Sequence, residues 1–231
     1  MDRREASAGL AAFVLAAIGP EAQALAIASI TDLDAGRGLK AALDTGAASA
    51  VGALGVQDGF LGNPKVRIPL PGWLHGAEKI LKAIGQRKQV EELEVAMNRA
   101  AENAVPLARE LLVNAVKNIG VGDAKRILTG GDTSVTEFFV ARTREPLSVR
   151  FLPVVKQATA KVGLAEKYDR IAARASATGL VKMEDASIDH YVTRKALDGL
   201  YFMIGEEERH IRRDPLGTGS ALLAKVFGSL R

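Results

Sequence analysis

The sequence predicts an all-α protein: a single compact domain of roughly eight or nine helices with one long proline-rich loop. Apolar residues recur at three- to four-residue spacing along most of the chain, and only residues 66–70 alternate as a strand does. Apolar residues make up 48% of the chain but aromatic residues only 5%, and many of the apolar residues are alanine. This composition favours helices, because alanine has the highest helix propensity and strands are enriched in aromatic and β-branched residues.

Residues 1–26 have the order of a secretory signal peptide. Arg3 and Arg4 precede an apolar run at residues 10–18, a helix-breaking Gly-Pro pair follows, and alanines then recur at alternate positions up to Ala26. This order is typical of a cleavable leader, and the run is too short to span a bilayer. The alternative is an amphipathic first helix, but the run lacks the polar face of a surface helix. We therefore predict a mature helical domain of residues 27–231 with a periplasmic location.

The first half of the mature chain is predicted to contain a helix, a loop and two further helices. An apolar stripe extends from Asp34, as the cap, to about Leu54. Glycines and prolines then interrupt the helical period over residues 55–72, which predicts the long loop. A short helix at about residues 74–84 and a long one at residues 87–119 follow, and we expect the second to kink or restart at Pro106.

The second half is predicted to contain a short turn and several helices, with Gly163 and Gly179 as stops. Asp123 is expected to cap a short turn that ends at Thr129-Gly130-Gly131, and Asp132 or Thr133 to cap the helix after it. The backbone N–H groups at this turn could hold an anion, but the capping side chain is expected to occupy them. Further helices are predicted at about residues 146–162, 165–178, 187–213 and 221–230.

Four separated stretches resemble one bacterial family. They are Gly59-Phe-Leu-Gly-Asn-Pro-Lys-Val-Arg-Ile-Pro-Leu-Pro71, Met97-Asn-Arg-Ala-Ala-Glu-Asn103, Ile127-Leu-Thr-Gly-Gly-Asp132 and Tyr191-Val-Thr-Arg-Lys-Ala-Leu-Asp-Gly-Leu200. Together they resemble the domain-of-unknown-function family 4197, from about residue 39 to the carboxyl terminus. The resemblance implies an exported, mostly helical protein and carries over no catalytic residue.

Composition and motifs exclude several kinds of chemistry. There is no cysteine, so disulfides, thiolate catalysis and cysteine-based metal sites are absent. Glu207 and His210 have the i, i+3 spacing of di-metal bundles, but such a site needs that motif twice, so we predict no metal and no cofactor. The net charge is +4 and the basic residues are dispersed, so no nucleic-acid partner is expected.

Two groups of residues are candidates for ligand binding. The loop carries Phe60 and Ile68, and Trp73 and His75 lie just beyond it; these apolar side chains either cross the core or are exposed for binding. The second group is polar: Arg99 and Glu102 interrupt one apolar helix, and Arg194 and Asp198 interrupt another. If the two helices pack together, Arg99, Glu102 and Asp198 form a network that either fixes helix register or lines a pocket for an anionic or amphipathic ligand.

Three functions follow from these features. The leading hypothesis is a non-enzymatic module of the cell envelope that binds a small amphipathic ligand or a partner protein. The alternative is a hydrolase-like enzyme with a dispersed site, for which Glu102, Arg99 and His190 are the candidates. The third is a structural or assembly protein, which would form homo-oligomers. No sequence motif decides whether the protein is an enzyme, but the absence of a catalytic signature favours binding.

Overall fold

The computed structural model describes residues 32–72, 87–177 and 187–214, and every regular element within them is helical. The all-α prediction is thus confirmed for the described part of the chain. The elements are α2 (Asp32–Leu54), α4 (Arg87–Ala104), the 3-10 helix η2 (Val105–Leu107), α5 (Ala108–Lys117), α6 (Val121–Thr129), α7 (Ser134–Thr159), α8 (Gly163–Ala177) and α9 (Ile188–Arg213). The α-helices among these elements are fewer than the eight or nine predicted, and the predicted helices at residues 74–84 and 221–230 lie outside the described residues.

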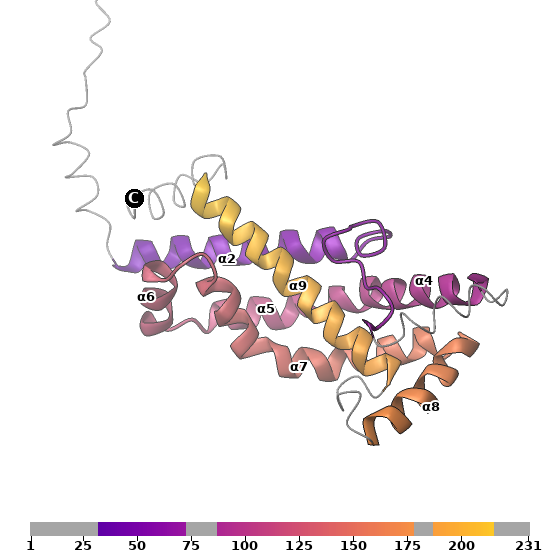
Figure 1. The fold of residues 1–231 in the computed structure, drawn as a ribbon. Helices are drawn as coiled ribbons and strands as arrows, with labels where there is room; N and C mark the ends of the chain where they lie inside the picture. The colour runs from indigo at the N-terminus through magenta and orange to yellow at the C-terminus, as the bar shows by residue number, and fades with distance from the viewer. Residues whose placement is uncertain (1–31, 73–86, 178–186, 215–231) are drawn as a thin grey trace, which may run out of the picture.

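Helices α7 and α9 pack together most extensively, and α4 lies against both. Figure 1 shows α9 crossing α2 and α7 diagonally. Helix α2 packs on α5 and α9, α6 contacts α7 and α2, and α8 contacts α4 and α9. The two longest of these helices, α7 and α9, therefore position the shorter ones around them.

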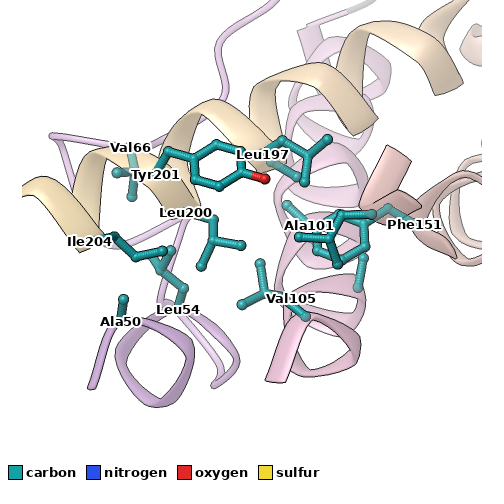
Figure 2. Close-up of a cluster of buried hydrophobic side chains, with 14 of the residues drawn as sticks. Ala50, Leu54, Val66, Ala101, Val105, Phe151, Leu197, Leu200, Tyr201 and Ile204 are labelled. Carbon is teal, nitrogen blue, oxygen red and sulfur yellow. The ribbon is translucent and has the colours of Figure 1, made fainter. Parts of the chain in front are cut away.

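The buried apolar side chains of the described residues form one cluster. In Figure 2, side chains of α9 meet side chains from α2, the following loop, α4, η2 and α7: Leu197, Leu200, Tyr201, Ile204, Ala50, Leu54, Val66, Ala101, Val105 and Phe151. Burying the larger of these side chains, those of valine, leucine, isoleucine and phenylalanine, contributes roughly 1.5–3 kcal/mol each. Every long helix thus contributes to the same core.

The prediction of a break at Pro106 is confirmed. Helix α4 ends at Ala104, the turn tightens into η2 with Pro106 inside it, and α5 begins at Ala108. Proline has no N–H for the i→i−4 bond and its ring collides with the preceding turn. A short 3-10 segment accommodates both effects.

The prediction of a separate helix beginning at Pro146 was wrong. Helix α7 continues through Pro146 and Pro153 to Thr159. Leu147 and Phe151 are fully buried, as are residues earlier in α7, so both halves of the helix pack into one core. This packing outweighs the local cost of the prolines.

Residues 55–71 contain no helix, and they run across the core rather than away from it. The apolar side chains of this segment, called the loop, are buried at Phe60, Val66, Ile68 and Leu70. None of the helices in the described part of the chain combines the length and the apolar character that crossing a membrane requires.

Candidate functional site

Three polar residues of α4, Asn98, Arg99 and Glu102, hold the loop and together form the loop anchor. Asn98 is fully buried; its Oδ1 accepts from the N–H of Ile68 at 2.8 Å and its Nδ2 donates to the carbonyl of Ile68 at 2.9 Å. Ile68 is itself buried, so both of its backbone groups need partners inside the protein. Asn98 supplies both from one side chain.

Glu102 and Arg99 hold the beginning of the loop. Oε1 of Glu102 accepts from the N–H groups of Phe60 and Leu61 at 3.0 and 3.1 Å, and Oε2 accepts from Arg99 at 2.6 Å. Arg99 also donates to the carboxylate of Asp58 at 2.8 Å. Asp58 has a φ of 66°, in the left-handed region that few non-glycine residues adopt. The hydrogen bonds to Glu102 and then to Asp58 hold the pKa of Arg99 above its ordinary value.

The other side of the loop packs on α9. A Cβ at Gly199 would lie 2.6 Å from Cε1 of Phe60, so only glycine leaves room for the ring. The hydroxyl of Tyr191 donates to the carbonyl of Pro69 at 3.0 Å. The loop is therefore bonded to both α4 and α9, and three of the four stretches behind the family resemblance meet here.

Four predicted ligand-binding residues belong to this packed arrangement: Phe60, Ile68, Arg99 and Glu102. Phe60 and Ile68 lie inside the core, and the polar atoms of the loop anchor bond to the loop. The arrangement fixes the loop on α4, and the loop side chains of Phe60 and Ile68 are buried rather than exposed for a ligand. Trp73 and His75 lie outside the described residues.

The predicted network of Arg99, Glu102 and Asp198 does not form. Although α4 and α9 do pack together, Asp198 bonds at 2.5 Å to Arg144 of α7 and lies 3.6 Å from Arg194. The Arg194 guanidinium also lies 5.5 Å from the ring centroid of Tyr191. Asp198 thus faces α7 rather than the loop anchor, and Arg194 belongs to a separate, partly exposed cluster.

The histidines within the described residues are placed as surface groups. Nδ1 of His190 lies 3.2 Å from Oγ of Ser187, but Ser187 is the N-cap of α9 and also accepts from the backbone N–H of His190. His190 and His210 are both exposed. The Ser187–His190 contact is therefore a helix cap rather than a nucleophile with its base.

The run from Glu206 to His210 forms ion pairs and hydrogen bonds, not a metal site. Glu206 pairs with Arg209 and, at 2.6 Å, with Lys65; the bond to Arg209 and then that to Lys65 lower the pKa of Glu206 to about 2. Glu207 accepts from Ser49 at 2.8 Å. The described residues contain no group of three or more histidines and acids that could hold a metal ion.

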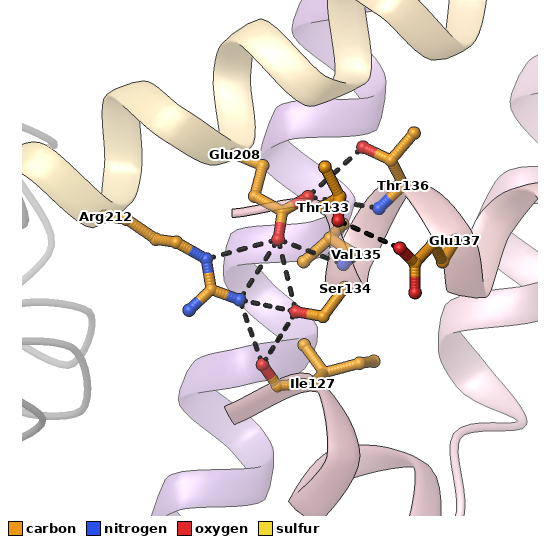
Figure 3. Close-up of polar contacts among 8 residues, drawn as sticks. All are labelled: Ile127, Thr133, Ser134, Val135, Thr136, Glu137, Glu208 and Arg212. Atoms are coloured by element: carbon orange, nitrogen blue, oxygen red, sulfur yellow. Dashed lines mark hydrogen bonds and ion pairs between the residues drawn. The ribbon is translucent and has the colours of Figure 1, made fainter. Parts of the chain in front are cut away.

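Glu208 anchors the first turn of α7 from α9 (Figure 3). Its side chain is only 1% exposed, and its oxygens accept from the N–H groups of Val135 and Thr136 at 3.0 and 3.1 Å. Arg212 pairs with it at 3.0 Å and also donates to the carbonyl of Ile127 at 2.9 Å. One buried ion pair thus joins the end of α9, the start of α7 and the end of α6.

Of the caps predicted in this region, the position of Thr133 is confirmed, but its capping bond is not. Thr133 stands at the N-cap of α7 but makes no capping bond; its hydroxyl donates to Glu137 at 2.9 Å. Glu208 takes the amides instead, since a carboxylate is favoured at the positive end of the helix dipole. Asp123 is not the predicted N-cap residue, because α6 begins two residues earlier with Gly120 as its N-cap.

A groove of about 280 Å³ lies where α6 meets α2 and the end of α5, and we call it the α6 groove. It is lined by Gly36, Arg37, Lys40, Ile119, Gly120, Val121 and Ala124. Most of its lining is apolar, and the Val121 side chain is 83% exposed. Side chains added at Gly36 or Gly120 would meet no atoms within 4 Å, so these glycines leave the backbone at the groove open.

The charged side of the α6 groove consists of Arg37 and Lys40. Nζ of Lys40 donates to the carbonyl of Lys117 at the end of α5, at 3.0 Å, which fixes the ammonium beside the groove. The Arg37 side chain is exposed. Sequence reasoning missed this site because its residues come from two distant segments. The available signal was a valine between two glycines at residues 120–122.

The sequence model of one family, described as "Protein of unknown function (DUF4197)", matches residues 29–228. The match confirms the resemblance drawn from four stretches and extends it about ten residues towards the amino terminus. Neither the comparison with curated proteins nor that with solved structures finds a match.

Proposed function

Because this chain belongs to the DUF4197 family, whose function is unknown, we propose its function from its own site: a non-catalytic module that binds a small amphipathic anion in the α6 groove. The observation that carries the proposal is the combination, in one hollow, of an apolar lining with two basic side chains. An apolar lining with a few placed polar groups is the usual character of small-molecule sites.

The apolar part of the ligand would lie against Val121, Ile119 and Ala124. Among these residues Val121 would contribute most to the binding free energy, because its side chain is almost fully exposed and burying it in a complex removes apolar surface from water. The volume of about 280 Å³ is just below the usual range for ligand sites, which favours a single alkyl chain or a single-ring ligand.

The anionic part would lie between Arg37 and Lys40. Lys40 is held in place by its bond to the end of α5, so little side-chain entropy is lost when it meets an anion. Arg37 contributes a fork of N–H donors that fits a carboxylate or phosphate. The net charge of +4 attracts such a ligand at longer range.

The enzyme alternative has no comparable support. Two of its candidates, Arg99 and Glu102, bond to the loop, and His190 is part of a helix cap. We retain export as part of the proposal: residues 1–26 would be removed, leaving residues 27–231 as the helical domain in the periplasm. The order of basic, apolar and small residues at the amino terminus supports it.

Isothermal titration calorimetry with three probes tests the groove. Decanoate carries both features of the ligand, decanol lacks the charge and acetate lacks the chain. We expect decanoate to bind more tightly than either. Arg37→Gln should weaken decanoate binding about fivefold, the equivalent of about 1 kcal/mol for an exposed ion pair, and leave decanol unchanged.

Two matched variants complete the test. Val121→Asn removes apolar surface without disturbing the core, so it should weaken both decanoate and decanol. Lys88→Gln removes a cation that is 88% exposed on α4, away from the groove, and should change nothing. Equal binding of decanoate by the Arg37→Gln and wild-type proteins would overturn the proposal.

A further inference from the structure

A second hollow lies on a different face of α6, between it and the first half of α7. This α6–α7 cleft has a volume of about 390 Å³. The α6 groove uses Val121 and Ala124, whereas the cleft uses Asp123 and Arg126 from the same helix. Any role of the cleft is independent of the function proposed for the α6 groove, because no residue lines both hollows.

One wall of the cleft carries two guanidinium groups held by a single carboxylate. Asp123 accepts from Arg126 through one oxygen and from Arg142 through the other, the latter at 2.9 Å. The guanidinium of Arg142 also lies 5.6 Å from the ring centroid of Phe138, a cation–π distance. The bond from Arg126, and then the charge of Arg142, lower the pKa of Asp123. The two cations are therefore fixed side by side.

These guanidinium groups retain donors for a ligand. Each has five N–H groups, and only a few are used in the bonds to Asp123. Arg126 is 79% exposed and Arg142 50% exposed, so the remaining N–H groups can be reached from solvent. Two cations against one carboxylate leave a net positive charge on this wall, which suits a phosphate or carboxylate.

Glu137 gives the cleft a negative pole. It lies five residues before Arg142 on α7, about 7.5 Å along the helix axis. One of its oxygens accepts from the hydroxyl of Thr133 at 2.9 Å, and the side chain is exposed. Its carboxylate would repel a plain anion but would pair with an ammonium group.

The remaining walls leave room for a ligand and do not compete for it. The first amides of α7 are taken by Glu208, so an anion in the cleft has the arginines as its partners. A side chain added at Gly131 would meet no atom within 4 Å, so the backbone there is open to the cleft. The charged groups that face the cleft are thus two arginines, the aspartate that joins them, and one glutamate.

We propose that the α6–α7 cleft binds a small zwitterion, with its phosphate or carboxylate on Arg126 and Arg142 and its ammonium group on Glu137. A ligand with both charges complements every charged group of the cleft, whereas a simple anion or cation meets repulsion at one end.

Nuclear magnetic resonance with phosphoethanolamine, inorganic phosphate and ethanolamine as probes tests this assignment. The amide signals of Gly130 and Gly131 report on the cleft. We expect phosphoethanolamine to shift them saturably at millimolar concentration and to bind at least about tenfold more tightly than either half, as two weak ion pairs together allow. Vesicles carrying phosphoethanolamine headgroups, added in place of the free compound, show whether a lipid also supplies the group.

Single substitutions separate the two poles. Arg126→Gln changes an exposed side chain and should weaken phosphoethanolamine and phosphate alike. Glu137→Gln should weaken phosphoethanolamine but strengthen phosphate, a reversal that loss of folding cannot produce. Arg150→Gln, elsewhere on α7, is the matched control and should change neither. Absence of saturable shifts, or equal shifts in the Arg126→Gln protein, would overturn the assignment.

Discussion

The substitution Asn98→Ala tests whether the loop is held chiefly by the loop anchor. Asn98 makes three hydrogen bonds: one from the N–H of Ile68 at 2.8 Å, and one each to the carbonyls of Ile68 and Glu94, at 2.9 and 2.8 Å. The two hydrogen bonds between Asn98 and Ile68 lie in the core, since these residues are 0% and 1% exposed.

The magnitude follows from these contacts. A hydrogen bond contributes about 1 kcal/mol net, and a buried donor or acceptor left without a partner costs about 1–3 kcal/mol. Asn98→Ala leaves both backbone groups of Ile68 unpaired. We therefore expect the free energy of unfolding to fall by about 3–5 kcal/mol, which is a large share of the stability of a typical domain.

Urea unfolding followed by circular dichroism measures this loss, with an unchanged slope showing that the native state stays compact. Asn118→Ala is the matched control: its side chain makes one exposed bond, to the carbonyl of Asn114 at 2.9 Å, so its loss should be under about 1 kcal/mol. If Asn98→Ala cost no more than Asn118→Ala, the loop would not depend on the loop anchor.

Three further predictions concern α9. Gly199→Ala should lower the free energy of unfolding by about 1–3 kcal/mol, because the new methyl group would collide with the Phe60 ring. Adding Phe60→Leu to the same chain should recover part of the lost stability, whereas additive losses in urea unfolding would contradict this explanation. Glu208→Gln should cost about 2 kcal/mol by the same assay, since two amides and an arginine lose a charged partner, and an unchanged midpoint would argue against the anchor. Titration of labelled glutamate side chains should place the pKa of Glu206 near 2, and Arg209→Gln should raise it. Because this pKa is lower in the folded protein than in the unfolded chain, the ion pairs stabilise the fold at pH values above the ordinary pKa of glutamate, and this contribution is lost as the pH falls towards 2. A measured pKa near the ordinary value would refute the pairing.

The spacing of apolar residues, together with the positions of glycine and proline, predicted helix ends correctly where an end depends on local chemistry. The stripe ending near Leu54 and the break at Pro106 were both predicted, because a glycine- and proline-rich segment and a missing N–H act on their own neighbours. The continuation of α7 past Pro146 was not, since tertiary packing of its second half outweighs the local penalty. Nor could the spacing of apolar residues show that Asp198 faces α7.

The candidate site was harder to predict than the fold for a physical reason. Sequence spacing identified Arg99 and Glu102 because polar residues inside an apolar helix are conspicuous, but such residues persist in a core only when their bonds are satisfied within the protein. A ligand site needs the opposite: polar groups that can still form hydrogen bonds or ion pairs with a ligand. Those occur at the surface, where Arg37 or Arg126 cannot be told from other solvated cations until the fold shows which hollow they line.

Both hollows adjoin α6, and the packing of α6 explains why. Of its described side chains only that of Ile127 is buried, whereas α9 buries residues along its whole length. Its end is held by Arg212 and Ser134, which both donate to the carbonyl of Ile127, at 2.9 and 3.0 Å. A helix that is fixed at one end by hydrogen bonds, and that packs on the core through Ile127 and the partly buried Ala124 and Leu128, leaves space on its other faces. In this protein α2, α4, α7 and α9 build most of the core, and α6 is where unfilled space and exposed charged side chains coincide.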